Sequence, residues 1–183
     1  MKYHLIVGNG KWGNKVLNFL EKKKKYRVIV KTRFKYIDFK TNKKIKSNRI
    51  NKNNIKSIHI CSPVNTHYFY LKKFSYVNKI LVEKPFLKNF SQLNKIKKLL
   101  KKKYLLVDYI DTFNPILTKA KQVIKKNKLK KIIFDYSNIK KFYQKEFEFS
   151  YEWLDHPLSL ILYLFKKFPK FVIEKTVIVK KKI

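Results

Sequence analysis

Four things are scarce in this sequence: cysteine, long apolar runs, acidic residues and glycine. Cys61 is the single cysteine among 183 residues, so a disulfide framework is excluded and a reducing cytoplasm is expected. The longest strongly apolar segment, 157–165 (PLSLILYLF), is much shorter than the roughly 20 residues of a membrane-spanning helix. The N-terminal MKYHLIV is too short for the apolar core of a signal peptide. We therefore expect a cytoplasmic protein without a membrane span.

Acidic residues number 11 against 46 lysines and arginines, which gives a formal net charge of +35. Such a charge is typical of nucleic-acid-binding proteins. However, only Arg27, Arg33 and Arg49 are arginines, and the lysines are scattered over nearly every segment. AT-rich codons explain the abundance of Lys, Asn, Ile, Phe and Tyr. We expect no specific nucleic-acid partner; the alternative, a lysine-rich nucleic-acid binder, would gather basic and aromatic residues on one face.

All 3 glycines fall in the stretch 6–16, IVGNGKWGNKV, with the spacing G-x-G-x-x-G. An apolar run precedes them and a segment with helical periodicity follows, so the order is strand, turn, helix. In that context Gly8 forms the turn, Gly10 lets a pyrophosphate approach the backbone, and Gly13 lets the helix pack closely on the strand. An ordinary glycine turn is the alternative. The predicted cofactor contacts in this stretch are Gly8, Asn9, Gly10, Lys11, Trp12 and Gly13.

The first 111 residues alternate between strand and helix patterns, which predicts an α/β fold with a Rossmann-type parallel sheet. Strands are expected over 3–7, 26–32, 55–61, 79–83 and 104–109. Helices are expected over 12–22, 65–74 and 91–103, the last capped by Ser91 with Leu93, Ile96, Leu99 and Leu100 on its apolar face. The polar segment 40–54 is expected to be a surface loop or a short frayed helix. Residues 1–111 would form the dinucleotide-binding domain.

After residue 111 the pattern changes. Helices are expected over 115–127 and 157–168, and strands over 130–139, 144–151 and 171–181. Residues 112–183 would therefore form a second, shortened α+β lobe that contributes to substrate binding or to oligomerisation.

Four ordered motifs resemble those of the glucose-fructose oxidoreductase, inositol dehydrogenase and MocA family. They are ICSPVNTHYFY, ILVEKPF, LLVDYIDTFNP and EWLDHPLSLILYL, and the resemblance covers residues 1–165. It implies an NAD(P)-dependent oxidoreductase acting on a hydroxyl or carbonyl of a sugar, a sugar derivative or a cyclitol. The family is longer, roughly 300 residues, at the upper end of single-core sizes. A compact variant, a fragment of a split gene and a dinucleotide-binding protein without activity are the three interpretations of this difference.

The resemblance also implies roles for individual residues. Lys84 of the Glu83-Lys84-Pro85 motif would lie near the reacting carbon, and Pro85 would follow a cis peptide beside the nicotinamide. His156 would exchange a proton with the same hydroxyl. Glu152 stands at the family's acidic position with Asp155 close by, and either carboxylate could orient His156 or the sugar. The predicted catalytic residues are Lys84, His156, Glu152 and Asp155.

Three positions depart from the family pattern: Thr112 replaces an arginine found in many members, Glu152 replaces an aspartate, and Ser159 replaces an acidic residue. The remaining cofactor contacts that the resemblance implies are Ser62, Pro63, His67, Glu83, Lys84, Pro85 and Asn114. Asn65 and Thr66 are expected to cap the next helix. No His/Cys pair stands at metal-ligand spacing, so no metal site is expected.

Cofactor choice follows from the end of the second predicted strand. An NAD-specific fold places an acidic residue about 20 residues beyond the glycines, where it binds the ribose hydroxyls. This sequence has Lys31, Thr32 and Arg33 there, and no acid until Asp38. A guanidinium suits a 2′-phosphate, so Thr32 and Arg33 predict a preference for NADP over NAD. Because a shortened lobe would leave a sheet edge or face exposed, we also expect a homo-oligomer.

Overall fold

A seven-stranded mixed sheet forms the centre of the computed structural model, which describes residues 2–23, 27–33, 35–126, 131, 133 and 146–166. Its strand order is β4-β3-β2-β1-β5-β6-β7. The strands are β1 Tyr3–Val7, β2 Arg27–Lys31, β3 Tyr36–Asp38, β4 Lys44–Ile45, β5 Ile55–Ile60, β6 Lys79–Val82 and β7 Tyr104–Val107. The five strands expected from the sequence are parallel to one another, which confirms the α/β fold.

The sheet is nevertheless not wholly parallel, because β3 and β4 pair antiparallel at the β2 edge. The sequence analysis missed β3 and assigned β4 to a surface loop. The rest of that segment contains two short 3₁₀ turns, η1 Ser47–Arg49 and η2 Lys52–Asn54. The error has a physical reason, since strands of three and two residues are too short for a period-2 pattern to emerge.

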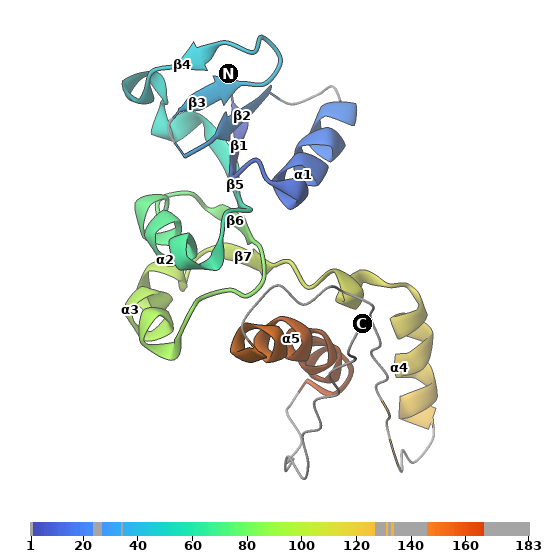
Figure 1. Cartoon of the computed structure of the whole chain (residues 1–183). Helices are drawn as coiled ribbons and strands as arrows, with labels where there is room; N and C mark the ends of the chain where they lie inside the picture. Colours follow the sequence, from blue (N-terminus) through green and yellow to red (C-terminus); the bar gives the residue numbers. More distant parts are fainter. Residues whose placement is uncertain are drawn as a thin grey trace, which may run out of the picture.

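Helices cover the two faces of the sheet separately: α1 Lys11–Lys22 lies on one side, and α2 Val64–Lys73 and α3 Phe90–Leu100 on the other (Figure 1). The apolar residues of β1 alternate between these layers. Leu5 and Val7 join the core under α2 and α3, whereas Ile6 packs with Leu17 and Leu20 of α1. All five β1 residues are buried, as expected for a parallel strand covered on both faces.

Two expected helix starts are corrected by the structure. Asn89, not Ser91, caps α3, because its side chain accepts a hydrogen bond from the backbone N–H of Gln92 at 3.0 Å. Pro63 is the residue before α2, so Asn65 and Thr66 lie within the helix rather than at its cap. On α3, Ile96 and Leu100 are buried as expected, but Leu99 is 45 % exposed.

Beyond β7 the chain forms the 3₁₀ turn η3 Ile110–Phe113, then α4 Ile116–Lys126 and α5 Glu146–Phe165 (Figure 1). Helix α5 overturns two expectations: residues 146–151 are helical rather than a strand, and the helix does not start at Pro157. The alternation of Phe147, Phe149 and Tyr151 resembles a strand. Phe147, Tyr151, Leu154 and Leu158 also recur at helical spacing, and no glycine interrupts them.

The proposed domain boundary after residue 111 falls inside η3, and the division into two domains stays a prediction. Apart from residues 131 and 133, the strands expected over 130–139 and 171–181 lie outside the described residues. Within the described part of the chain, no helix has the length and apolar character needed to cross a membrane.

Candidate active site

The glycine turn joins β1 to α1 and has the geometry of an anion-binding turn. Gly8 has a φ of +94°, and a Cβ there would lie 2.8 Å from the carbonyl oxygen of Cys61. A Cβ at Gly13 would overlap the carbonyl oxygen of Gly8. By contrast, a Cβ at Gly10, the residue before α1, would meet no described atom within 4 Å. The open space at Gly10 lies at a helix N-terminus, so the site fits the pyrophosphate of a dinucleotide.

The turn lies where the parallel strands end. Gly8 N–H donates to the carbonyl of Lys31 at the end of β2, at 2.9 Å, and Cys61 N–H donates to Val7 at 2.8 Å. Glu83 and Asp108 N–H groups continue this alignment after β6 and β7. The residues after five neighbouring strands therefore share one edge of the sheet, which is where α/β folds bind ligands.

Three acidic or thiol side chains follow β5, β6 and β7 on the side of α1: Cys61, Glu83 and Asp108. Burial, reinforced by the charge of Asp108, raises the pKa of Glu83 to about 7, although Lys84 acts in the opposite direction. Burial and the same two carboxyls raise the pKa of Cys61 to about 12. A raised pKa favours the neutral thiol of Cys61, which is the less nucleophilic form of cysteine.

Trp12 connects the start of α1 to Asp108, one of these three side chains. Its indole Nε1–H donates to Asp108 Oδ2 at 2.8 Å. The neighbouring Asn9 and Lys11 side chains are exposed beside Gly10. The contact of Trp12 with a cofactor stays a prediction, but its contact with Asp108 gives it a positioning role that the sequence does not reveal.

His67 connects the loops that follow β5 and β6. It is 1 % exposed, and its ring hydrogen-bonds to the carbonyl oxygens of Ser62 (Nε2, 2.6 Å) and Pro85 (Nδ1, 3.0 Å). Pro63 and the half-buried Ser62 lie in the first of these loops. The Lys84–Pro85 peptide is cis, as the resemblance implies. His67 is thus placed to hold both loops in position, and a direct contact between His67 and a cofactor stays a prediction.

The end of β2 presents basic and hydroxyl groups. Thr32 Oγ1 lies 3.2 Å from the carbonyl oxygen of Lys35, and Arg33 is exposed. Asp38, the first acid beyond this point, is buried and bound by Arg27 at 2.7 Å. Arg27 lies at the opposite end of β2 from Thr32, so Asp38 is not the ribose-binding acid of an NAD-specific fold.

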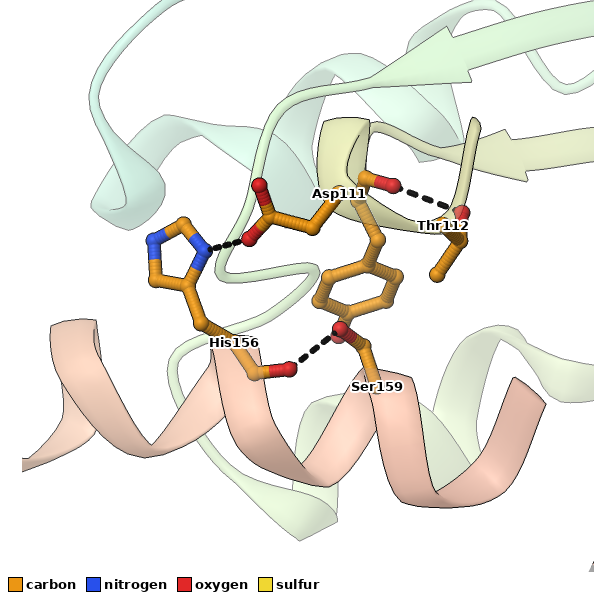
Figure 2. A network of polar contacts seen from close by, with 5 residues as sticks. Asp111, Thr112, His156 and Ser159 are labelled. Atoms are coloured by element: carbon orange, nitrogen blue, oxygen red, sulfur yellow. Dashed lines mark hydrogen bonds and ion pairs between the residues drawn. The ribbon is translucent and has the colours of Figure 1, made fainter. Parts of the chain in front are cut away.

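The second half of the chain contributes a carboxylate–imidazole pair. His156 on α5 points toward Asp111 on η3, and His156 Nδ1 hydrogen-bonds to Asp111 Oδ2 (Figure 2). Asp155 is adjacent and half-buried; burial raises its pKa, while the charges of Lys84 and His156 lower it in part. The structure thus places Asp155 next to the Asp111–His156 pair.

The other predicted residues of this half lie nearby in the chain. Glu152 lies one helical turn before His156 in α5, and its role stays a prediction. Asn114 follows η3, and its side chain accepts a hydrogen bond from Ile116 N–H at 3.0 Å. Asn114 therefore supports the start of α4, and its contact with a cofactor stays a prediction.

A cavity of about 370 Å³ lies between η3 and α5. Two of the positions that depart from the family pattern, Thr112 and Ser159, are on its wall. The lining residues are Tyr109, Thr112, Asp155, Leu158, Ser159, Leu162 and Tyr163.

Sequence reasoning missed Asp111 and Asp108. Both lie in the quoted motif LLVDYIDTFNP, so the available signal was a carboxylate at a strand end followed by another three residues later. Their partners, His156 and Trp12, are 45 and 96 residues away in the chain. Only the tertiary fold identifies these pairs.

Solved structures provide the comparison with known proteins; no protein-family model and no curated protein matches the sequence. A protein from Sinorhizobium meliloti assigned as a myo-inositol dehydrogenase superposes with a TM-score of 0.66 at 15 % identity, covering 92 % of this chain and 56 % of that chain. An NAD-binding protein from Listeria innocua gives 0.64 at 17 % identity, with 90 % and 55 % covered. The UDP-N-acetylglucosamine 3-dehydrogenase of Acidithiobacillus ferrooxidans gives 0.52 at 13 % identity, with 67 % and 44 % covered.

The chain has the fold of these oxidoreductases. The expected resemblance to the glucose-fructose oxidoreductase, inositol dehydrogenase and MocA family is therefore confirmed at the level of the fold. The chain spans about half the length of the oxidoreductases that it matches.

Proposed function

We propose that this chain is an NAD(P)-dependent oxidoreductase that acts on a hydroxyl or carbonyl of a sugar, a sugar derivative or a cyclitol. One observation carries the proposal: Asp111 of η3 and His156 of α5 form a carboxylate–imidazole pair in a chain whose glycine turn fits a dinucleotide. Lys84, in the loop after β6, is the proposed second group for proton transfer. The turn η3 follows β7, so both Lys84 and Asp111 come after the carboxyl ends of parallel strands.

Each group has a chemical role in this proposal. Oxidation of a hydroxyl removes a hydride and a proton, and the bound nicotinamide would accept the hydride. Lys84 and His156 would share the proton transfer at the hydroxyl oxygen. Asp111 would orient the imidazole of His156 through its contact with Nδ1. Asp155 and Glu152 remain the candidates for holding a neighbouring hydroxyl.

The test of turnover is Lys84→Ala, with the exposed Lys88→Ala as the matched control. A group acting in the transition state should lower kcat strongly while leaving cofactor affinity nearly unchanged. Lys88→Ala should change neither. If Lys84→Ala keeps the wild-type rate, the assigned mechanism is wrong. If the wild type binds cofactor but oxidises no sugar or cyclitol, the chain is a dinucleotide-binding protein without activity.

We also propose a preference for NADP over NAD, with NAD as a possible second cofactor. Support comes from Thr32 and Arg33 at the end of β2 and from the engagement of Asp38 by Arg27. Fluorescence titration with NADPH and NADH should show tighter NADPH binding. Arg33→Asp should remove that preference because a carboxylate repels a 2′-phosphate, whereas Arg49→Asp, the same change at an exposed arginine of η1, should not. Equal affinity of the wild type for both cofactors would contradict the assignment.

We also propose that the protein is a homo-oligomer and that it works in the cytoplasm. In the described part of the chain β7 is the last strand of the sheet, and its Tyr104 and Leu106 are 78 % and 44 % exposed. Exposed apolar side chains on an edge strand favour association. Light scattering over micromolar concentrations checks this, and a strictly monomeric protein would count against it.

A further inference from the structure

A second cavity, of about 280 Å³, lies at the end of the sheet opposite to the glycine turn. Tyr3 and Arg27 are the first residues of β1 and β2 and are partners in the parallel ladder, whereas the glycine turn and Thr32 follow the other ends of these strands. Strand β4 and the turns η1 and η2 complete the wall, and Figure 1 shows β4 far from α5. The polar lining residues are Tyr3, Arg27, Lys44, Arg49, Asn51 and Asn54.

Two of the three arginines of the chain meet in this cavity. Arg27 and Arg49 line it together with Lys44, and no residue that lines it in the described structure is acidic. The chain uses lysine for nearly all of its 46 basic positions. A general excess of basic residues therefore does not account for two arginines on one wall. A guanidinium differs from an ammonium in its planar set of N–H donors, which matches the oxygens of a phosphate.

The charges on this wall are only partly compensated. Asp38 Oδ2 accepts a hydrogen bond from Arg27 Nε–H at 2.7 Å and lies 2.7 Å from Arg27 Nη2. Asp38 therefore balances the charge of Arg27 but leaves the Nη1 hydrogens for another acceptor. The side chains of Lys44 and Arg49 form no ion pair or hydrogen bond with any other residue that the structure describes. Two positive charges thus remain, which equals the charge of a phosphate dianion.

Asn51 is held with its amide hydrogens unused. Its Oδ1 accepts a hydrogen bond from Asn53 N–H at 3.0 Å, and its backbone carbonyl accepts one from the Tyr3 hydroxyl at 2.9 Å. The Nδ2 group therefore keeps its donors. Tyr3 is 4 % exposed, so its hydroxyl fixes the η2 turn to the core of the sheet. The wall thus combines guanidinium, ammonium and amide donors on a positioned backbone.

We propose that this cavity is an anion site that binds a phosphate dianion, either free or carried by a small phosphorylated molecule. Arg49 and Lys44 would supply the balancing charges, and Asn51 a neutral donor. A volume just below the roughly 300 Å³ of the smallest ligand pockets suits a compact ligand. The inference goes beyond the proposed function, because the length of β1 and β2 separates this cavity from the glycine turn. The apolar wall residues, which would face a carbon skeleton, are Ile29, Ile45 and Ile50.

Calorimetric titration with three probes tests the inference. Inorganic phosphate and glycerol 3-phosphate, both mainly dianions at about pH 8, are compared with uncharged glycerol. Ionic strength is kept constant with sodium chloride, because a net charge of +35 attracts any anion. Both phosphate probes should bind saturably at one site per chain, and glycerol should not bind. Equal affinities would identify free phosphate as the ligand, and tighter binding of glycerol 3-phosphate would identify a phosphorylated small molecule.

Substitution of Arg49 assigns the binding to this cavity. Arg49→Gln should weaken phosphate binding about ten- to hundredfold, because it removes a charged donor. Lys97→Gln makes the same change in net charge at an exposed position of α3 and should have little effect. Arg33→Gln should also leave the affinity nearly unchanged, since Arg33 lies beyond the other end of β2. All three side chains are exposed, and circular dichroism verifies that each variant is folded.

The outcomes separate this inference from the proposed function. The absence of saturable binding by both phosphate probes would overturn the inference, as would equal losses in Arg49→Gln and Lys97→Gln. An RNA oligonucleotide that needs Arg49 for binding, while neither phosphate probe binds, would overturn it in favour of a nucleic-acid contact. NADPH titration of Arg49→Gln should match the wild type, and a loss there would overturn the separation of the two sites. A protein that binds no nicotinamide cofactor would contradict the proposed function and leave the phosphate titration as a valid test.

Discussion

Replacing Glu83 by glutamine would remove a carboxyl group that the fold holds partly out of water beside Asp108. Burial raises the pKa of Glu83 from 4.5 to about 7, and the charge of Asp108 contributes in the same direction. Between these two pH values the folded protein binds more protons at this site than the unfolded chain does. The free energy of unfolding must therefore fall as pH rises from about 4.5 to about 7.

The magnitude follows from the same pKa. A change of one pKa unit corresponds to about 1.4 kcal/mol, so the full effect would be about 3 kcal/mol. Because the side chain is only half-buried, solvent screening reduces the expected effect to about 1–2 kcal/mol. Glu83→Gln has no such titration. Relative to the wild type it should gain about 1–2 kcal/mol between about pH 4.5 and about pH 8.

Urea unfolding followed by circular dichroism at these two pH values provides the measurement. Other groups titrate in the same range, so the informative quantity is the change in the difference between wild type and variant. Glu21→Gln, at an exposed position of α1, serves as the matched control and should show no change. A difference between wild type and Glu83→Gln that stays constant, or that moves against the variant at high pH, would refute the reasoning.

Further predictions concern the glycine turn and the half-buried His59. Gly13→Ala should destabilise the fold by several kcal/mol, because its Cβ would overlap the backbone of Gly8, whereas Gly10→Ala should cost under about 1 kcal/mol but weaken cofactor binding. Urea unfolding and cofactor titration of both variants check this, and equal stabilities would contradict it. Burial lowers the pKa of His59 to about 4, with a further contribution from His4, so the folded state holds fewer protons there than the unfolded chain. The free energy of unfolding should then fall by up to about 3 kcal/mol as pH drops from about 6.5 to about 4. His59→Gln should weaken this dependence of the free energy of unfolding on pH. The same pH dependence in wild type and variant would contradict the prediction.

The parallel part of the fold could be predicted because its signals are local. Each of the five parallel strands is a short apolar run, and the glycine spacing fixes where the first one turns into a helix. Strands β3 and β4 could not be predicted because they contain only three and two residues, and their pairing depends on β2. The start of α5 was predicted wrongly because alternating aromatic residues match both a strand and a helix over so short a stretch.

The candidate site could be predicted only in part, and for a related reason. Gly8 and Gly13 are required by backbone contacts that a motif encodes directly. No motif identifies the partner of His156. The sequence offers three carboxylates near it in the motifs, Asp111, Glu152 and Asp155. The choice of Asp111 depends on how α5 packs on η3. Likewise the convergence of Thr112 and Ser159 on one cavity is a property of that packing and of no single segment.

The exposed edge at β7 has a consequence for how this protein behaves in concentrated solution. Three consecutive lysines, 101–103, directly precede Tyr104, and Lys79 is its partner across the β6–β7 ladder. Two copies that pair through β7 add their positive charges at this edge, and lysines at an edge strand oppose the association that the exposed Tyr104 and Leu106 favour. Their repulsion extends over about 8 Å at physiological ionic strength and shortens as salt is added. Self-association through β7 should therefore increase with ionic strength. Dilute buffers should keep the copies apart, and concentrated salt should bring the β7 edges into contact.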